Sequence, residues 1–281
     1  MGLGAQERVG PTCPPQESCP PSEPSWSGGW SGHLEALAAN VLVGGLTGGI
    51  GQWRGEGSFW RGLWRGGLGG AGTYLGKRLV AGNGPAPAVV GRAVGAAGSS
   101  MSRNAADGLP LLERLVLPVG PIRLHLRPRE GNVRASVDLF TVGAIAYPYL
   151  SSMDASLDLH QSIYSGALVF MASDWEAGWG WHGRHVGGNI LVRGDAIGPG
   201  FLRQILAHER VHLVQYDQAH ILWGDALEGR ILRWVGLGDP VTTRVDVSLL
   251  SMVLSASTLI VPHDWLPWEI EAHVFAETFP H

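Results

Sequence analysis

The run His208-Glu209-Arg210-Val211-His212 contains residue types at a spacing suited to metal chemistry. Residues four positions apart lie above one another on one face of a helix, so His208 and His212 could hold one divalent cation. Glu209 directly follows the first histidine, from where its carboxylate could reach a water molecule beside the cation. The pattern predicts a zinc site with His208 and His212 as ligands and Glu209 as the general base of a hydrolysis.

The segment around this run has the features of a long, largely buried helix. Gly198-Pro199-Gly200 breaks the chain before it, and no glycine or proline occurs from 201 to 218. Apolar residues recur at helical spacing between Leu202 and Val214. The sequence therefore predicts a helix over 199–222, whose backbone would fix the geometry of the two imidazoles.

A catalytic zinc normally takes three protein ligands and leaves a fourth position for water, so a third ligand is needed from elsewhere. The segment 267–277 reads as a second helix, opened by Pro267. Together with the first run, Glu269-Ile270-Glu271-Ala272-His273 resembles the gluzincin group of zinc metallopeptidases, in which a Glu-x-x-Ala pattern on a later helix surrounds the third ligand. The resemblance implies Glu269 as that ligand, with Glu271 as the alternative.

The resemblance covers residues 199–277 and implies zinc-dependent cleavage of a peptide bond. This chain has His273 where those enzymes usually carry Asp or Asn four residues after the ligand glutamate. A donor that stabilises the developing oxyanion could be Tyr216, His220 or His182, and the sequence does not choose among them. Gln215 is interpreted as a hydrogen-bonding neighbour of the site, because neutral amides are poor zinc ligands.

Alternative interpretations of the same residues stay open. His208 and His212 could be partly buried imidazoles without a metal, or the zinc could be structural in a protein that no longer catalyses a reaction. His182 and His185 have ligand-like spacing but lie in a glycine-rich stretch flanked by tryptophans. We interpret that pair as part of a surface loop in preference to the rim of an active site.

The chain of 281 residues is 45% hydrophobic and 16% charged, with a net charge of -4, which suits one or two globular domains. This charge argues against nucleic acid as a partner. Residues 1–32 are rich in Pro, Gly and Ser and are predicted to be a disordered arm. Cys13 and Cys19 in this arm could form a disulfide or remain free thiols, and no conventional signal peptide is visible.

Residues 33–107 are rich in glycine and small residues, and are predicted to form helices that could pair as a hairpin. Glycines at four-residue spacing, such as Gly44 and Gly48, would let helix backbones approach closely. Residues 33–100 could associate with a membrane or pack within a soluble protein; tryptophans beside arginines would suit a membrane interface. A membrane-associated or extracytoplasmic location is favoured over the cytoplasm.

Residues 108–281 are predicted to form an α+β, zincin-like domain, with a small sheet before the metal-binding helices. Strands are expected at 132–139, where Val133 and Val137 alternate with polar residues as in a half-buried strand, and at 166–172 and 189–193. The 189–193 strand is expected at the sheet edge, available to an extended substrate. Further helices are expected at 225–235 and 245–258.

Two functions are consistent with these patterns. The first is a zinc-dependent metallopeptidase with a peptide or protein substrate. The second is a non-catalytic membrane or envelope protein with a glycine-zipper region and a degenerate or structural metal-binding domain. The sequence does not predict cleavage specificity or the oligomeric state.

Overall fold

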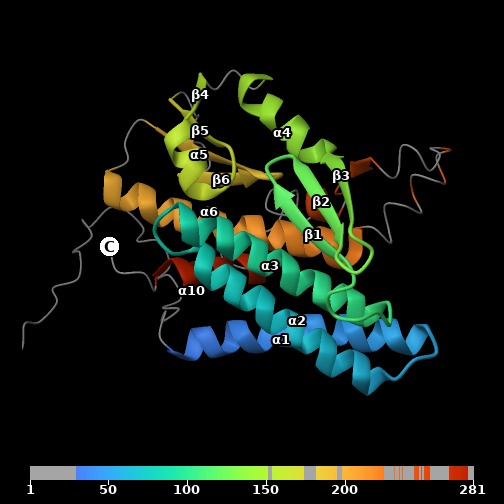
Figure 1. Ribbon diagram of the computed structural model, residues 1–281. Helices are drawn as coiled ribbons and strands as arrows, with labels where there is room; N and C mark the ends of the chain where they lie inside the picture. The colour runs from blue at the N-terminus through green and yellow to red at the C-terminus, as the bar shows by residue number, and fades with distance from the viewer. Residues whose placement is uncertain are drawn as a thin grey trace, which may run out of the picture.

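Figure 1 shows the protein as a computed structural model, in which helices and two small sheets form an α+β fold as predicted. The structure describes residues 30–150, 154–173, 182–194 and 198–224, the positions 231, 234, 236, 244–246, 248 and 250–253, and residues 266–277. Cys13, Cys19 and most of the arm predicted over 1–32 lie outside these residues, as do most of the helix predicted over 225–235 and part of the helix predicted over 245–258.

Three helices form a bundle at the start of the described chain: α1 (Trp30–Arg54), α2 (Phe59–Val80) and α3 (Pro85–Ala106). The side chain of Ser58 caps α2 by accepting a hydrogen bond from the Arg61 amide, and Pro85 lies in the first turn of α3. The helices predicted in the glycine-rich region are therefore present.

The glycines at four-residue spacing form the contact between α1 and α2. A Cβ added to Gly66 would lie 2.2 Å from the carbonyl oxygen of Gly44, and one added to Gly48 would lie 2.3 Å from that of Gly62. Only glycine fits at such distances, so the two backbones touch directly. This close approach makes the α1–α2 hairpin a compact unit.

Helix α6 (Pro199–Ala219) runs between the bundle and the sheets (Figure 1). It continues into a π-helical segment, η1 (His220–Gly224), so the helix predicted over 199–222 is present with a changed hydrogen-bond pattern at its end. Helix α10 (Pro267–Glu277) coincides with the second predicted helix. One apolar core joins these helices to the bundle, and its buried members are Ala36, Val80, Ala81, Ala207, Val211, Val214, Ala272, Phe275 and Ala276.

The second sheet contains β4 (Ala155–Leu157), β5 (Val169–Ala172), β7 (Asn189–Arg193) and β6 (Gly183–Val186), in that order. The strand predicted over 189–193 is present, but its expected position at the edge is wrong. It pairs with β5 on one side and with β6 on the other, and β6 is the edge strand beside it. All but the last residue of β7 are buried because both neighbouring strands and α6 cover it.

The first sheet pairs β1 (Leu115–Val119), β2 (Ile122–Arg127) and β3 (Asn132–Asp138) in antiparallel fashion and adds β8 (Val245–Asp246) parallel to β3. Strand β3 is half-buried as predicted, but its polar face is the buried one. Ser136 and Asp138 are 2% and 1% exposed, whereas Val133 is 66% exposed. Partners inside the protein explain this, since Arg123 forms an ion pair with Asp138 at 2.7 Å.

Three further elements differ from the expectations. Helix α5 (Leu159–Ser165) ends at Gly166, which has a left-handed backbone conformation, so the strand predicted from 166 begins only at Val169. Val245 and Asp246 form a strand where a helix was predicted to begin, because β3 provides hydrogen-bond partners that local sequence patterns do not reveal. Helix α4 (Leu139–Leu150) follows β3 directly, and the Asp138 carboxylate accepts hydrogen bonds from its first amides.

Candidate metal centre

Helix α6 places the two histidines of the sequence motif on one face. The Nε2 atoms of His208 and His212 lie 2.9 Å apart, and both side chains are buried within the protein. Four residues complete slightly more than one helical turn, so both rings point toward the same volume. The i, i+4 spacing thus produces the convergence that the sequence predicted.

Helix α10 brings Glu269 to these imidazoles. Its Oε2 atom lies 3.1 Å from Nε2 of His208 and 2.9 Å from Nε2 of His212. These three groups could hold a metal ion, with all their ligand atoms within 4.8 Å of one another. Ligands at about 2.1 Å from a tetrahedral zinc are separated by about 3.4 Å, so the three atoms need to move apart by only some tenths of an ångström.

The charges of the three groups are strongly coupled. Burial lowers the pKa of His208, which therefore favours the neutral form. Burial alone would also lower the pKa of His212, but the adjacent Glu269 carboxylate overrides this effect and raises it above the ordinary value. The metal-free cluster consequently holds a proton mainly on His212, and a metal cation would replace it.

Gln215 orients the ring of His212. Its Nε2 donates to the carbonyl oxygen of Trp268 at 2.9 Å and to Oε2 of Glu271 at 2.8 Å, which leaves its Oε1 facing His212. That oxygen lies 2.7 Å from Nδ1 of His212 and accepts a hydrogen bond from Nδ1–H. The tautomer with hydrogen on Nδ1 leaves the lone pair of Nε2 directed at Glu269 and His208, as metal ligation requires.

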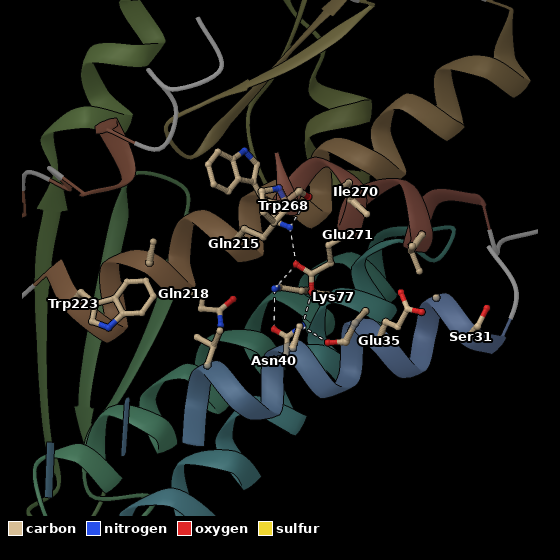
Figure 2. Close-up of a pocket in the computed structure, with 17 residues that line it drawn as sticks. Ser31, Glu35, Asn40, Lys77, Gln215, Gln218, Trp223, Trp268, Ile270 and Glu271 are labelled. Atoms are coloured by element: carbon tan, nitrogen blue, oxygen red, sulfur yellow. Dashed lines mark hydrogen bonds and ion pairs between the residues drawn. The ribbon is translucent and has the colours of Figure 1, made fainter. Parts of the chain in front are cut away.

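Glu271, the alternative third ligand, belongs to this supporting network instead of the cluster of three ligands. Figure 2 shows its carboxylate between Gln215 of α6 and two residues of the bundle, Lys77 and Asn40. Lys77 Nζ lies 2.7 Å from Oε2 of Glu271 and also donates to Oδ1 of Asn40 at 2.9 Å. A chain of polar contacts therefore extends from the bundle to a ligand of the candidate metal centre.

A pocket of about 540 Å³ lies between α1, α6 and α10 (Figure 2). Its polar wall contains Asn40, Lys77, Glu271 and Gln215, the same residues that support His212. Most of the other side chains around it are apolar, among them those of Val43 and Trp268. The pocket thus adjoins the candidate metal centre through Gln215.

Glu209 is buried on α6 and packs against strand β6. A Cβ added to Gly183 would lie 3.0 Å from Oε1 of Glu209 and 2.4 Å from a methyl carbon of Ile205. The absence of a side chain at Gly183 therefore leaves the space in which the Glu209 carboxylate lies. Strand β6 and α6 together bring this carboxylate next to the histidine face of the helix.

Two further histidines lie beside the cluster, and the sequence associated only one of them, His273, with the site. His185 lies on β6 and stacks on His212 with ring centroids 5.0 Å apart, so its placement in a surface loop is wrong. Burial and the neighbouring His212 ring lower the pKa of His185 to about 3. His273, one turn after Glu269, lies 4.6 Å from the His208 ring. Its position four residues after Glu269 is the one at which the resemblance places a residue that orients a ligand imidazole.

Two of the suggested oxyanion donors make contacts elsewhere. The Tyr216 hydroxyl donates to Oδ2 of Asp138 at 2.6 Å, and Nδ1 of His220 lies 3.2 Å from the Ser248 hydroxyl oxygen. His182 is exposed and its ring contacts that of Phe201. The structure therefore does not bring Tyr216 or His220 to the cluster as a donor.

Comparisons of the chain with protein families, with curated proteins and with solved structures give no match.

Proposed function

We propose that the protein is a zinc-dependent hydrolase that cleaves peptide bonds, with His208, His212 and Glu269 as the zinc ligands. The observation that carries this proposal is the convergence of two imidazole nitrogens and one carboxylate oxygen within 4.8 Å of one another. Two histidines and a glutamate are a ligand set of catalytic zinc sites, which keep one position open for water. The gluzincin resemblance of the sequence supports the same assignment.

The residues of the chain then take distinct roles. Bound zinc would polarise a water molecule and the substrate carbonyl as a Lewis acid. The Glu209 carboxylate removes a proton from the attacking water and delivers it to the leaving amine. Gln215 holds His212 in the tautomer that exposes Nε2, and the stacked ring of His185 limits access of bulk water to that side.

The position of β6 supports an extended peptide as the substrate. This strand is at the edge of its sheet, it carries His185 against His212, and its Gly183 adjoins Glu209. A peptide that pairs with an edge strand presents its backbone in a fixed register. Pairing along β6 would therefore align a scissile bond with the metal ligands and with Glu209, as in a zincin-like domain.

Metal analysis of the purified protein together with two variants tests this function. We expect one zinc per chain in the parent, loss of zinc in His212→Ala, and retention of zinc in Glu209→Gln. Hydrolysis of a mixed peptide library should fall by about 10²- to 10⁴-fold in Glu209→Gln, the range for removal of a general base. Glu35→Gln, a change at an exposed carboxylate on α1, serves as the control.

The outcomes separate the alternatives. A parent that contains no zinc under metal-replete conditions removes the metallohydrolase proposal. A parent with stoichiometric zinc and no hydrolysis of any library peptide supports a structural or degenerate metal site.

A second candidate function, a membrane-associated protein, is favoured by the exposed surface of the α1–α2 hairpin. Helix α1 is apolar and long enough to span a bilayer, and a third of its most apolar stretch is buried inside the protein. Leu42, Leu46 and Ile50 lie one turn apart on α1 and are exposed, and Trp60, Trp64 and Leu68 repeat this pattern on α2. Lipid contact would cover both apolar rows, with Trp60 and Trp64 at the interface.

Flotation of the full chain with phosphatidylcholine vesicles tests membrane association through these rows. We expect the parent to float and the double variant Leu46→Gln/Leu68→Gln to remain in the soluble fraction. Leu112→Gln, at an exposed leucine outside the hairpin, is the control. Failure of the parent to float would exclude attachment through these apolar rows.

A further inference from the structure

A second pocket, of about 380 Å³, shares no lining residue with the pocket between α1, α6 and α10. It is formed by the end of α3, by β1, β2 and β3, and by Ile221 of η1, and it contains none of the residues assigned to the metal centre. This volume lies within the range of small-molecule sites. The proposed hydrolase does not use it.

The charge of this pocket is opposite in sign to that of the whole chain. Its lining includes four arginines and His125 but only one carboxylate, Asp107, although the chain carries a net charge of -4. The arginines are Arg103, Arg114, Arg127 and Arg134. Such a concentration of guanidinium groups in a concavity attracts anions and focuses the field on them.

Contacts inside the protein hold some of these groups in place. Arg103 donates to the carbonyl oxygen of Leu222 at 2.9 Å, and its Nε lies 3.2 Å from Oδ2 of Asp107. The same carboxylate oxygen lies 3.7 Å from Arg114. The Asp107 carboxylate therefore contacts both guanidinium groups but neutralises only one of their two positive charges.

The remaining cations come from neighbouring strands. Arg127 has an exposed ion pair with Glu130 at 3.2 Å, and Arg134 forms no ion pair within the part of the chain that the structure describes. Exposed ion pairs are weak, so Arg127 can exchange Glu130 for a ligand at small cost. Arg134 lies directly opposite His125 in the β2–β3 register, which places both on the face toward the pocket.

Hydrogen bonds to buried groups behind the pocket fix the orientation of His125. Nε2 of His125 lies 2.7 Å from the hydroxyl oxygen of Ser136, and that hydroxyl donates to the Asp246 carboxylate. Because Ser136 donates to Asp246, its oxygen accepts from Nε2–H of His125. The imidazole is thereby held in one orientation in the lining of the pocket.

We propose that this pocket binds a phosphate group through Arg103, Arg114, Arg127 and Arg134, with His125 beside them in the lining. Planar guanidinium groups match the oxygen geometry of phosphate and form charge-assisted hydrogen bonds with it. The group belongs either to a soluble phosphate compound or to a lipid headgroup. A lipid headgroup is consistent with the position of Arg103 near the end of α3. This end of α3 packs against the end of α1, where Gly51 contacts Ala106.

Two binding measurements on the full chain distinguish the two sources. The soluble arm is calorimetric titration with pyrophosphate at low ionic strength. The lipid arm is sedimentation with phosphatidylcholine vesicles that contain phosphatidic acid, compared with phosphatidylcholine alone. In whichever arm binds, Arg127→Met/Arg134→Met should weaken binding about tenfold or more, because two charge-assisted contacts are lost.

The control variant Arg78→Met/Arg203→Met removes the same charge at exposed positions outside the pocket and should bind within about twofold of the parent, since only long-range attraction changes. Arg134→Glu is a second pocket variant at an exposed site, and equal thermal unfolding of all variants verifies their folding. Pocket-dependent binding of pyrophosphate identifies a soluble phosphate, and pocket-dependent binding of phosphatidate vesicles alone identifies a headgroup. No saturable binding in either arm, or equal loss in the pocket and control variants, would overturn the proposal.

Discussion

Gln215 and His212 form a hydrogen bond in which Nδ1 of the imidazole lies 2.7 Å from Oε1 of the amide. The orientation of this amide is fixed because its nitrogen donates to the Trp268 carbonyl and to Glu271. Residues that orient a metal-binding imidazole in this way typically change metal affinity by 10- to 100-fold when they are removed. Loss of this hydrogen bond should therefore change the affinity of the protein for zinc.

Replacing Gln215 by leucine should weaken zinc binding by about 10- to 100-fold, because His212 loses the acceptor that holds its tautomer. A competition titration against a chromogenic zinc chelator measures the affinity. Gln218→Leu, which changes another glutamine lining the same pocket, should leave the affinity unchanged. Unaltered affinity in Gln215→Leu would show that the amide does not position the ligand.

The sequence predicted the parts of the candidate metal centre that depend on helical periodicity. The i, i+4 spacing placed His208 and His212 together, and Glu269, which the resemblance favoured over Glu271, lies with them in a group that could hold a metal ion. It could not identify His185, because the contact of this residue with His212 depends on how β6 packs against α6. Such a contact between elements distant in the sequence leaves no local pattern.

The fold, too, was predictable from the sequence only in part. Helices α6 and α10 and strand β7 occur where apolar spacing and chain breaks predicted them. The orientation of β3 was not predictable, since alternation of Val133 and Ser136 defines two faces without indicating which one is buried. Partners contributed by other elements, such as Tyr216 for Asp138, make the polar face the inner one.

Lys77 and Glu271 form a largely buried ion pair between the bundle and α10, at 2.7 Å. Replacing Lys77 by methionine leaves the Glu271 carboxylate without its cation, which should reduce the free energy of unfolding by about 3–5 kcal/mol. Urea denaturation measures the change. The double variant Lys77→Met/Glu271→Gln should recover part of the loss because the buried charge is then removed as well.

The neighbouring residue provides the control for this prediction. Arg78 is exposed, so Arg78→Met should change the free energy of unfolding by no more than about 0.5 kcal/mol. Equal effects of the Lys77 and Arg78 substitutions would contradict a stabilising role for the buried pair.

Gly66 and Gly67 are adjacent on α2, but only at Gly66 would an added Cβ overlap the backbone of α1, because it would lie 2.2 Å from the Gly44 carbonyl oxygen. Gly66→Ala should destabilise the protein by about 1–3 kcal/mol or more, because its methyl group would overlap the Gly44 carbonyl and force the helices apart. Gly67→Ala should stabilise it by about 0.5–1 kcal/mol through the higher helix propensity of alanine. A Cβ at Gly67 lies at an ordinary contact distance, 3.4 Å from Val41. Thermal unfolding measures both variants. Changes of opposite sign in their melting temperatures would verify the contact, whereas equal changes would contradict it.

The buried carboxylate of Asp246 should make stability depend on acidity. Burial alone would raise its pKa, but the adjacent His125, the hydrogen bond from Ser136 and the nearby cations override this effect and lower the pKa below the ordinary value of 3.8. A carboxyl group with a lowered pKa in the folded state stabilises the protein above its unfolded pKa, and this contribution is lost as the pH falls toward the folded value.

Asp246→Asn should therefore reduce the free energy of unfolding by about 1–3 kcal/mol at pH 7. The difference from the parent should stay constant down to about pH 5 and shrink below about pH 4, where the unfolded carboxylate takes up its proton. Urea denaturation of both proteins across this pH range measures the difference, with Glu35→Gln as a control at an exposed carboxylate; a difference that does not change with pH would show that the Asp246 charge is not the stabilising feature.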